Sequence, residues 1–267
     1  MALTPPLRVC ALYPSRMNIY ADRGNLILLQ RRCAARGIDF ELTACEAGDR
    51  IDPGGFDLFY VGGGQDRDQE QIAYDMLETK RDALAEAADA GRVILAVCGG
   101  YQLLGESYEL DDRTIPGLGL VDLKTIREPG PRLIGNVVID VDIAGETRLL
   151  AGFENHGGRT LLGPGERPLG RVIEGFGNNG RDGFEGVRKN NVFGTYLHGP
   201  LLPKNAWFAD HLTALALGRD GPFELAELDD RLEARAHECA IRAAGRSHGL
   251  AGRLARRLRP RNAPAAE

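Results

Sequence analysis

The segment that most constrains the fold of this chain covers residues 93–104. Five apolar residues, 93–97, lead directly into Cys98, two glycines and a stretch that suits a helix. A short, continuous apolar run bounded by a turn is typical of a strand that is buried on both faces. A strand that turns so abruptly into a helix belongs to a mostly parallel sheet covered by helices. Cys98 is then expected at the carboxyl edge of that sheet, where open α/β folds bind their ligands.

Strand and helix patterns alternate along the first hundred residues. Further strands are predicted at residues 7–13, 38–45 and 56–61. Helices are predicted between them, the first with Asp22 at its N-cap and a stop at Gly37, the second over residues 65–90. This alternation favours an α/β fold with helices on both faces of the sheet.

The pattern changes after Gly105. Three stretches alternate like antiparallel strands, and one more helix follows them: residues 133–143, 171–176, 183–196 and the helix 205–217. We therefore predict one α/β domain over residues 7–218, a mostly parallel sheet with antiparallel additions. Residues 219–267 are rich in Ala and Arg, which predicts a tail of one or two surface helices with a frayed end at 260–267.

Composition indicates a globular chain that works inside the cell. Hydrophobic residues make up 43% of the sequence, but no apolar run is long enough to span a bilayer. Residues 1–6 lack the basic and apolar parts of an export signal, so we expect the protein in the cytoplasm. Nine arginines and only two glutamates give residues 231–261 a net charge of +7, which leaves −12 for the rest. This asymmetry suggests a separate partner for the tail.

The cysteine at the strand-to-helix junction suits a nucleophile. The five cysteines are scattered along the chain: Cys10, Cys33, Cys45, Cys98 and Cys239. They form no CxxC pair, so neither a metal site nor a disulfide framework is predicted. A helix N-terminus lowers the pKa of a thiol, and the thiolate is the attacking species. The Gly99 N–H is expected to face the developing oxyanion. The other four cysteines are interpreted as ordinary small hydrophobic residues.

A nucleophilic thiol needs a base, and His198 is the histidine best placed for that role. It ends a β-branched and aromatic run, so we expect it at a strand end beside Cys98. His156, on a glycine-rich turn, is expected to touch substrate, whereas His211 lies in a helix and is interpreted as structural. Three glycines end the third strand, and no Lys-Ser/Thr pair follows them, which excludes a P-loop. The N–H of Gly63 among them is expected to be the second oxyanion donor.

Two motifs carry a resemblance to a known family. Residues 98–102 (CGGYQ) and 196–200 (YLHGP) resemble the CobB/CobQ-like branch of the class I glutamine amidotransferases. Four further stretches resemble the GatD family, the amidotransferase subunits of lipid II isoglutaminyl synthase: 17–25 (MNIYADRGN), 62–66 (GGGQD), 134–136 (IGN) and 152–158 (GFENHGG). The resemblance extends over about residues 7–218.

The resemblance implies a flavodoxin-like class I glutamine amidotransferase domain that hydrolyses glutamine to glutamate and ammonia. It also implies a heterodimer with a MurT-like partner, a Mur ligase homologue that uses ATP and magnesium. That partner amidates the α-carboxyl of D-glutamate in lipid II to D-isoglutamine. No cofactor, metal or nucleic acid is implied for this chain, which reaches lipid II through its partner, at most at the inner face of the membrane.

The same resemblance assigns the substrate contacts. Arg132 matches the arginine with which such subunits hold glutamine, and a guanidinium suits the bidentate grip of an α-carboxylate. Gln102, Asn136 and His156 lie within the matching motifs and are also expected to contact the substrate.

Two positions depart from the family pattern. Ala96 replaces the usual glycine two residues before the cysteine. Pro200 stands where most class I members carry a glutamate that orients the histidine, although the CobB/CobQ-like branch also tends to lack this acid. Either a dyad of Cys98 and His198 suffices, or an acid comes from elsewhere. We hypothesise that a partner carboxylate orients His198.

Two other functions stay open from the sequence. One is an amidotransferase for another acceptor, such as cobyrinic acid, although such enzymes usually carry their synthetase on the same chain. A chain of 267 residues has no room for a synthetase domain as well. The other is a non-catalytic subunit that activates a synthetase, and the intact Cys98 and His198 argue against it. The acceptor rests on the resemblance alone.

Overall fold

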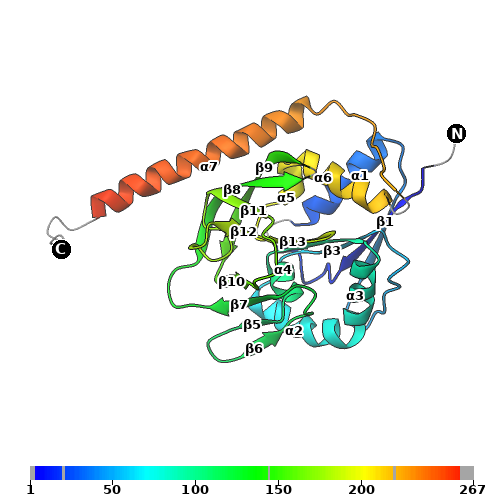
Figure 1. The fold of residues 1–267 in the computed structure, drawn as a ribbon, viewed down its shortest axis with the longest axis horizontal. Helices are drawn as coiled ribbons and strands as arrows, with labels where there is room; N and C mark the ends of the chain where they lie inside the picture. The colour runs from blue at the N-terminus through cyan, green and yellow to red at the C-terminus, as the bar shows by residue number, and fades with distance from the viewer. Residues whose placement is uncertain (1–3, 20–21, 144, 219–220, 259–267) are drawn as a thin grey trace.

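The structure, a computed structural model, describes residues 4–19, 22–143, 145–218 and 221–258, with side chains as far as residue 245. Its central sheet has six strands in the order β13-β14-β4-β3-β1-β2 (Figure 1). They are β1 (Leu7–Leu12), β2 (Phe40–Cys45), β3 (Leu58–Val61), β4 (Val93–Val97), β13 (Val187–Lys189) and β14 (Val192–Thr195). All neighbours are parallel except β13, which pairs antiparallel with β14. The predicted parallel sheet is confirmed.

Helices cover both faces of this sheet. They are α1 (Arg23–Ala35), α2 (Asp66–Asp75), α3 (Arg81–Asp89), α4 (Gly99–Leu104), α5 (Leu201–Lys204) and α6 (Ala206–Leu217). Figure 1 shows α1 and α6 on one side of the sheet and α2 and α3 on the other. One π-helical turn, Met76–Lys80, joins α2 to α3, so the helix predicted over residues 65–90 is interrupted once. Every residue of β3 and β4 is buried between the helix layers, which explains their continuous apolar sequences.

Two smaller sheets follow α4. One contains β10 (Gly158–Leu162), β7 (Leu123–Arg127), β5 (Ser107–Glu109) and β6 (Thr114–Pro116). The other contains β12 (Phe184–Glu185), β11 (Gly170–Glu174), β8 (Leu133–Ile143) and β9 (Glu146–His156). The predicted antiparallel strand at 133–143 is confirmed as β8, which pairs with β9 along its whole length.

The prediction of one antiparallel strand over residues 183–196 is wrong. This stretch contains three strands: β12 joins the second small sheet, β13 is antiparallel at the edge of the main sheet, and β14 is parallel to β4. All four residues of β14 are buried, because both of its faces lie inside the α/β layers.

The tail is a single helix, α7 (Arg231–Leu258). Ala240, Ile241 and Ala244 pack against Val138, Leu149 and Ala151 of the β8–β9 hairpin. Figure 1 shows the helix crossing that hairpin and continuing beyond the body of the molecule. The predicted frayed end at 260–267 lies outside the described residues.

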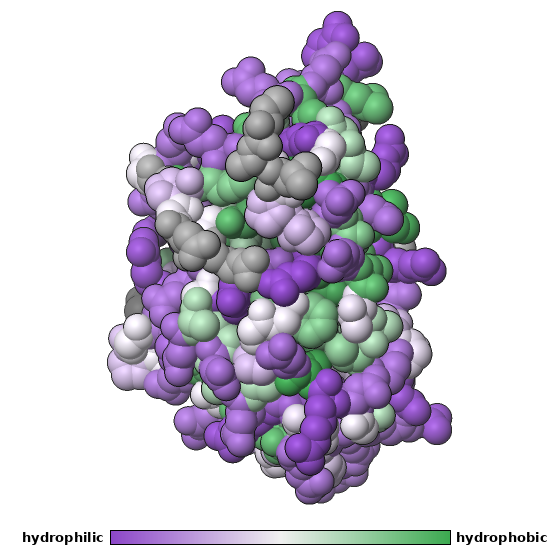
Figure 2. Space-filling view, turned by 90° about the vertical axis from the view of Figure 1, so that its right-hand side faces the viewer, coloured by the Kyte–Doolittle hydropathy of each residue, from purple (hydrophilic) through white to green (hydrophobic). Residues whose placement is uncertain are grey.

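Within the part of the chain that the structure describes, no helix is long and apolar enough to cross a membrane. The face drawn in Figure 2 is mostly hydrophilic, with only scattered hydrophobic residues.

Asp22 precedes α1, as predicted, but its carboxylate does not cap the helix. The Arg23 N–H donates instead to Oδ1 of Asn18, at 2.8 Å. Oδ2 of Asp22 accepts the N–H of Gly63, at 2.7 Å, just beyond the end of β3. The capping prediction is therefore wrong in its chemistry, because the carboxylate bonds to the neighbouring strand end and not to its own helix.

Candidate active site

Cys98 lies on a strained turn between β4 and α4. Its backbone has φ 53° and ψ −108°, in the left-handed half of the conformational map that non-glycine residues rarely adopt. The Cys98 N–H donates to the carbonyl of Thr195, at 2.8 Å, which fixes the turn against β14. A Cβ atom on Gly99 would lie 2.9 Å from the Gly64 backbone, and one on Gly100 would lie 2.7 Å from the Val61 carbonyl. The two glycines after the cysteine are therefore required by close backbone approach.

The strain at Cys98 predicts that glycine at this position makes the fold more stable than alanine does. Strain in such a region costs on the order of 1–3 kcal/mol, and glycine relieves it at an entropic cost of about 0.5–1 kcal/mol. We expect Cys98→Gly to unfold at higher urea concentration than Cys98→Ala, by about 1 kcal/mol in the free energy of unfolding. The alanine variant is the matched control, because it also lacks the thiol but keeps a Cβ atom at a positive φ. Equal stabilities of the two variants would show that the turn is not strained.

His198 follows β14 at the same edge of the sheet. The pairing of Thr195 with Val97 brings the ends of β14 and β4 together, so His198 and Cys98 both lie at the carboxyl edge. Two backbone hydrogen bonds to Phe153, each 3.0 Å, tie His198 to β9. The imidazole is fully buried. The structure thus brings the two predicted catalytic residues to neighbouring strand ends.

Both groups of the pair are held in their neutral forms. Burial, and next the charge of Asp22, raise the pKa of Cys98 to about 12, against the opposing effects of a Gly99 N–H hydrogen bond and of Arg132. Burial, and next the nearby His156, lower the pKa of His198 to about 3. A thiol and a neutral imidazole are therefore the resting forms, and formation of the thiolate requires help from the substrate or from a change in the site.

A cavity of about 450 Å³ opens beside Cys98, and Arg132 lines it. Asn155 fixes the guanidinium: Nε of Arg132 donates to its side-chain oxygen and Nη2 to its carbonyl, each at 2.8 Å. Arg132 is also close enough to lower the pKa of Cys98. A fixed guanidinium at this distance suits the α-carboxylate of an amino acid whose side chain reaches the thiol.

Gln102 and His156 form part of the buried wall of the cavity. The Gln102 amide accepts a hydrogen bond from Gln69, at 2.9 Å, and donates to the hydroxyl of Tyr196, at 3.1 Å. The His156 ring stacks on the Tyr196 ring, with centroids 3.6 Å apart, and its Nδ1 contacts the carbonyl of Gly158, at 2.8 Å. Both residues line the cavity. The Gln102 amide and Nδ1 of His156 already have partners, whereas Nε2 of His156 is buried without a hydrogen-bond partner among the described residues.

Asn136 and Gly63 do not line the cavity. Asn136 is half-buried on β8, opposite Phe153, and its contact with substrate stays a prediction. The Gly63 N–H bonds to the Asp22 carboxylate, so in this conformation it is not available to an oxyanion. The neighbouring Gly64 does line the cavity and lies against Gly99.

Most residues of the cavity wall were not predicted as site residues from the sequence, among them Asp66, Tyr108 and Arg127. Asp66 and Arg127 form an ion pair of 3.3 Å. Burial, and next the charge of Asp66, raise the pKa of Tyr108, whereas its hydrogen bond with Arg127 opposes this rise. Asp66 could have been identified from the sequence, because it lies just after the glycine run at 62–64. Arg127 and Tyr108 lie on short strands whose place beside the cavity depends on the sheet pairing.

Replacement of Arg132 is expected to weaken glutamine binding. Loss of a charge-assisted bidentate contact costs about 1.5–3 kcal/mol. We therefore expect Arg132→Ala to raise KM for glutamine about 10- to 150-fold, with a much smaller change in kcat. Steady-state glutaminase kinetics test this, with Arg113→Ala as the control, because Arg113 also lines the cavity but pairs with Asp112 and Glu70. Wild-type kinetics in Arg132→Ala would show that the arginine is misassigned.

The strained cysteine, the histidine on the adjoining strand and the arginine-lined cavity define an α/β domain built for thiol chemistry. The model of the CobB/CobQ-like glutamine amidotransferase domain matches residues 8–206, and the chain belongs to that family. This confirms the resemblance noted in residues 98–102 and 196–200.

Two named relatives and one solved structure are similar to this chain over most of its length. The chain is 41% identical over 233 residues to "Lipid II isoglutaminyl synthase (glutamine-hydrolyzing) subunit GatD" of Staphylococcus aureus, covering 86% of this chain and 93% of that protein. It is 39% identical over 212 residues to the subunit of the same name from Streptococcus pneumoniae, covering 79% and 80%. A solved structure, PurLQS from Thermotoga maritima, covers 80% of this chain and 96% of its own with a TM-score of 0.55 and 20% identity. That likeness concerns the fold alone.

Proposed function

We propose that this chain is the glutaminase subunit of a lipid II isoglutaminyl synthase. The observation that carries the proposal is that Cys98 and His198 follow neighbouring strands at one edge of the main sheet, while Cys98 and Arg132 line one cavity of about 450 Å³. The names of the two relatives at 39–41% identity support the same activity.

The chemistry proceeds in two halves. Cys98 transfers its proton to His198 and attacks the γ-carboxamide carbon while Arg132 holds the α-carboxylate. The Gly99 N–H and an N–H of the glycine run at 62–64 stabilise the oxyanion. His198 then gives its proton to the leaving ammonia. In the second half it takes a proton from water, which hydrolyses the γ-glutamyl thioester to glutamate and restores the thiol.

The acceptor is proposed from the names of the relatives, and the partner from the family resemblance of the sequence. Ammonia passes to a MurT-like Mur ligase homologue, which binds ATP and magnesium and amidates the α-carboxyl of D-glutamate in lipid II. The proposal therefore includes a cytoplasmic heterodimer that works where lipid II is exposed. The buried contacts of α7 with the β8–β9 hairpin leave its distal turns beyond the body, where the basic tail can meet that partner (Figure 1).

A nitrogen-tracing experiment tests the proposal. The chain is co-purified with a Mur ligase homologue and given lipid II, ATP, magnesium and glutamine labelled with ¹⁵N in its amide. The label is expected in the D-isoglutamine of the product, and mass spectrometry detects it. The complex carrying Cys98→Ser is expected to use only added ammonium. Unlabelled product from the wild-type complex would contradict the proposed nitrogen source, and absence of any product would contradict the acceptor.

A further inference from the structure

Both backbone groups of Gly63 form hydrogen bonds with residues that lie between β1 and α1. Its N–H donates to Oδ2 of Asp22, at 2.7 Å, and its carbonyl accepts the N–H of Ile19, at 3.0 Å. A Cβ atom on Gly63 would lie 2.5 Å from the Ile19 side chain, 3.0 Å from Oδ2 of Asp22 and 3.2 Å from Cβ of Cys98. The carboxylate and the nucleophile therefore both lie against the same glycine.

Asp22 is an unusual carboxylate to find in this place. It is completely buried, and its Oδ1 has no hydrogen-bond partner among the described residues. Burial raises its pKa to about 7, and the Gly63 N–H opposes this only in part. A buried, half-satisfied carboxylate destabilises a fold, so its presence beside a nucleophile indicates a functional constraint.

The carboxylate affects both parts of the oxyanion chemistry. It occupies the N–H of Gly63, and a negative acceptor is a stronger competitor for that donor than the neutral carbonyl of an incoming amide. Its charge is also, after burial, the largest cause of the raised pKa of Cys98. One side chain thus occupies the N–H that the sequence predicts as the second oxyanion donor, and it disfavours the thiolate.

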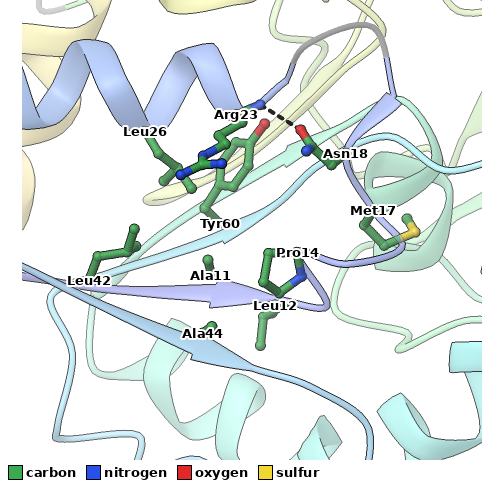
Figure 3. Close-up of a pocket in the computed structure, with 10 residues that line it drawn as sticks. All are labelled: Ala11, Leu12, Pro14, Met17, Asn18, Arg23, Leu26, Leu42, Ala44 and Tyr60. Atoms are coloured by element: carbon green, nitrogen blue, oxygen red, sulfur yellow. Dashed lines mark hydrogen bonds between the residues drawn. The ribbon is translucent and has the colours of Figure 1, made fainter.

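A cavity lies beside the residues that flank Asp22 in the sequence. This second cavity, of about 250 Å³, lies on the side of the loop turned toward β1 and β2 (Figure 3). Met17, Asn18 and Arg23 line it from the loop and from the start of α1, and Leu42 lines it from β2. The described residues on either side of Asp22 in the sequence, Asn18 and Arg23, therefore border an unfilled space.

We propose that Asp22 is a positioning residue that holds the Gly63 N–H off the oxyanion site, so that the chain is a slow glutaminase until this hydrogen bond is broken. The inference rests on the glutaminase function proposed above. Asp22 takes no part in proton transfer or substrate binding here. It acts through Gly63 and through the charge that it places beside Cys98.

The test compares Asp22→Asn and Asp22→Ala with wild type in the full chain. One oxyanion donor is worth about 10²–10³ in kcat, so partial release is expected to raise kcat for glutamine on the order of tenfold, more in the alanine variant. KM should change little, because Arg132 is untouched. A second readout needs no glutamine: alkylation of Cys98 by iodoacetamide should accelerate in both variants, because both lose the charge. Asp57→Asn is the matched control, a fully buried carboxylate that pairs with Arg8 instead.

The outcomes separate this inference from the proposed function. If wild type and variants release no ammonia from glutamine, alone or with the Mur ligase homologue, the function itself is wrong. If wild type hydrolyses glutamine and folded Asp22→Asn is equally fast or slower, with unchanged alkylation, Asp22 is a structural brace and the inference is overturned. Circular dichroism establishes folding, and Asp22→Asn, which keeps the shape of the side chain, covers the case in which Asp22→Ala does not fold.

Discussion

Replacing Cys98 with serine is expected to reduce glutamine hydrolysis by roughly 10⁴-fold or more, as loss of the nucleophile does in other hydrolases. A hydroxyl in the same place is a much weaker nucleophile, and a buried imidazole with a pKa of about 3 is a poor base for it. The fold should survive, because serine keeps the Cβ atom and nearly the volume of the cysteine. Ammonia release under single-turnover conditions is the sensitive measurement.

The other cysteines provide the controls for this experiment. Cys239 is exposed on α7, so Cys239→Ser should leave both activity and stability unchanged. Cys10, Cys33 and Cys45 are buried in the core, and their replacement by alanine should affect stability more than activity. An active Cys98→Ser enzyme would show that Cys98 is not the nucleophile.

Docking of the synthetase partner is expected to raise the glutaminase kcat of this chain by about 10²–10⁴, the range over which an orienting carboxylate acts in related triads. In this chain Pro200 stands two residues after His198, where most class I members have a glutamate. Glu185 lies beside the strand end, but its carboxylate accepts hydrogen bonds from the Thr195 hydroxyl and the Tyr196 N–H. A partner carboxylate near the imidazole would raise its pKa from about 3 and favour the thiolate–imidazolium pair.

The measurement compares glutaminase rates for the chain alone, for the complex, and for complexes in which each interfacial Asp or Glu of the partner is changed to Ala. One such change should return kcat to the level of the isolated chain. If the isolated chain is as fast as the complex and no partner acid matters, the dyad is self-sufficient. Asp22→Ala in the isolated chain separates this effect from release of the Gly63 donor, because it leaves the low pKa of His198 in place.

The fold and the catalytic pair could be predicted because their signals are local. The apolar run before Cys98 and the two glycines after it encode the strand, the turn and the close backbone contacts with Val61 and Gly64. His198 could be placed at a strand end from the composition of the residues before it. The direction of β14 could not, because parallel pairing with β4 depends on residues almost a hundred positions away.

The role of Asp22 could not be predicted from the sequence, because it also depends on a contact with a residue far along the chain. An aspartate just before a helix is a good N-cap, and local rules favour that interpretation. The structure gives the capping contact to Asn18 and turns the Asp22 carboxylate to Gly63, 41 positions along the chain. Asn155, which fixes Arg132, was likewise visible in a motif but had no recognisable role until β8 and β9 were paired.

The most direct test of the central claim is to identify the cysteine that reacts covalently with a ligand bound in the glutamine site. The wild-type chain is treated with an electrophilic glutamine analogue, a diazo ketone that alkylates thiolates bound in a glutamine site, and the labelled peptide is identified by mass spectrometry. The account predicts one label, on Cys98, slowed by excess glutamine and slowed strongly by Arg132→Ala. A label on Cys10, Cys33, Cys45 or Cys239, or labelling of Cys98 that glutamine does not slow, would contradict it.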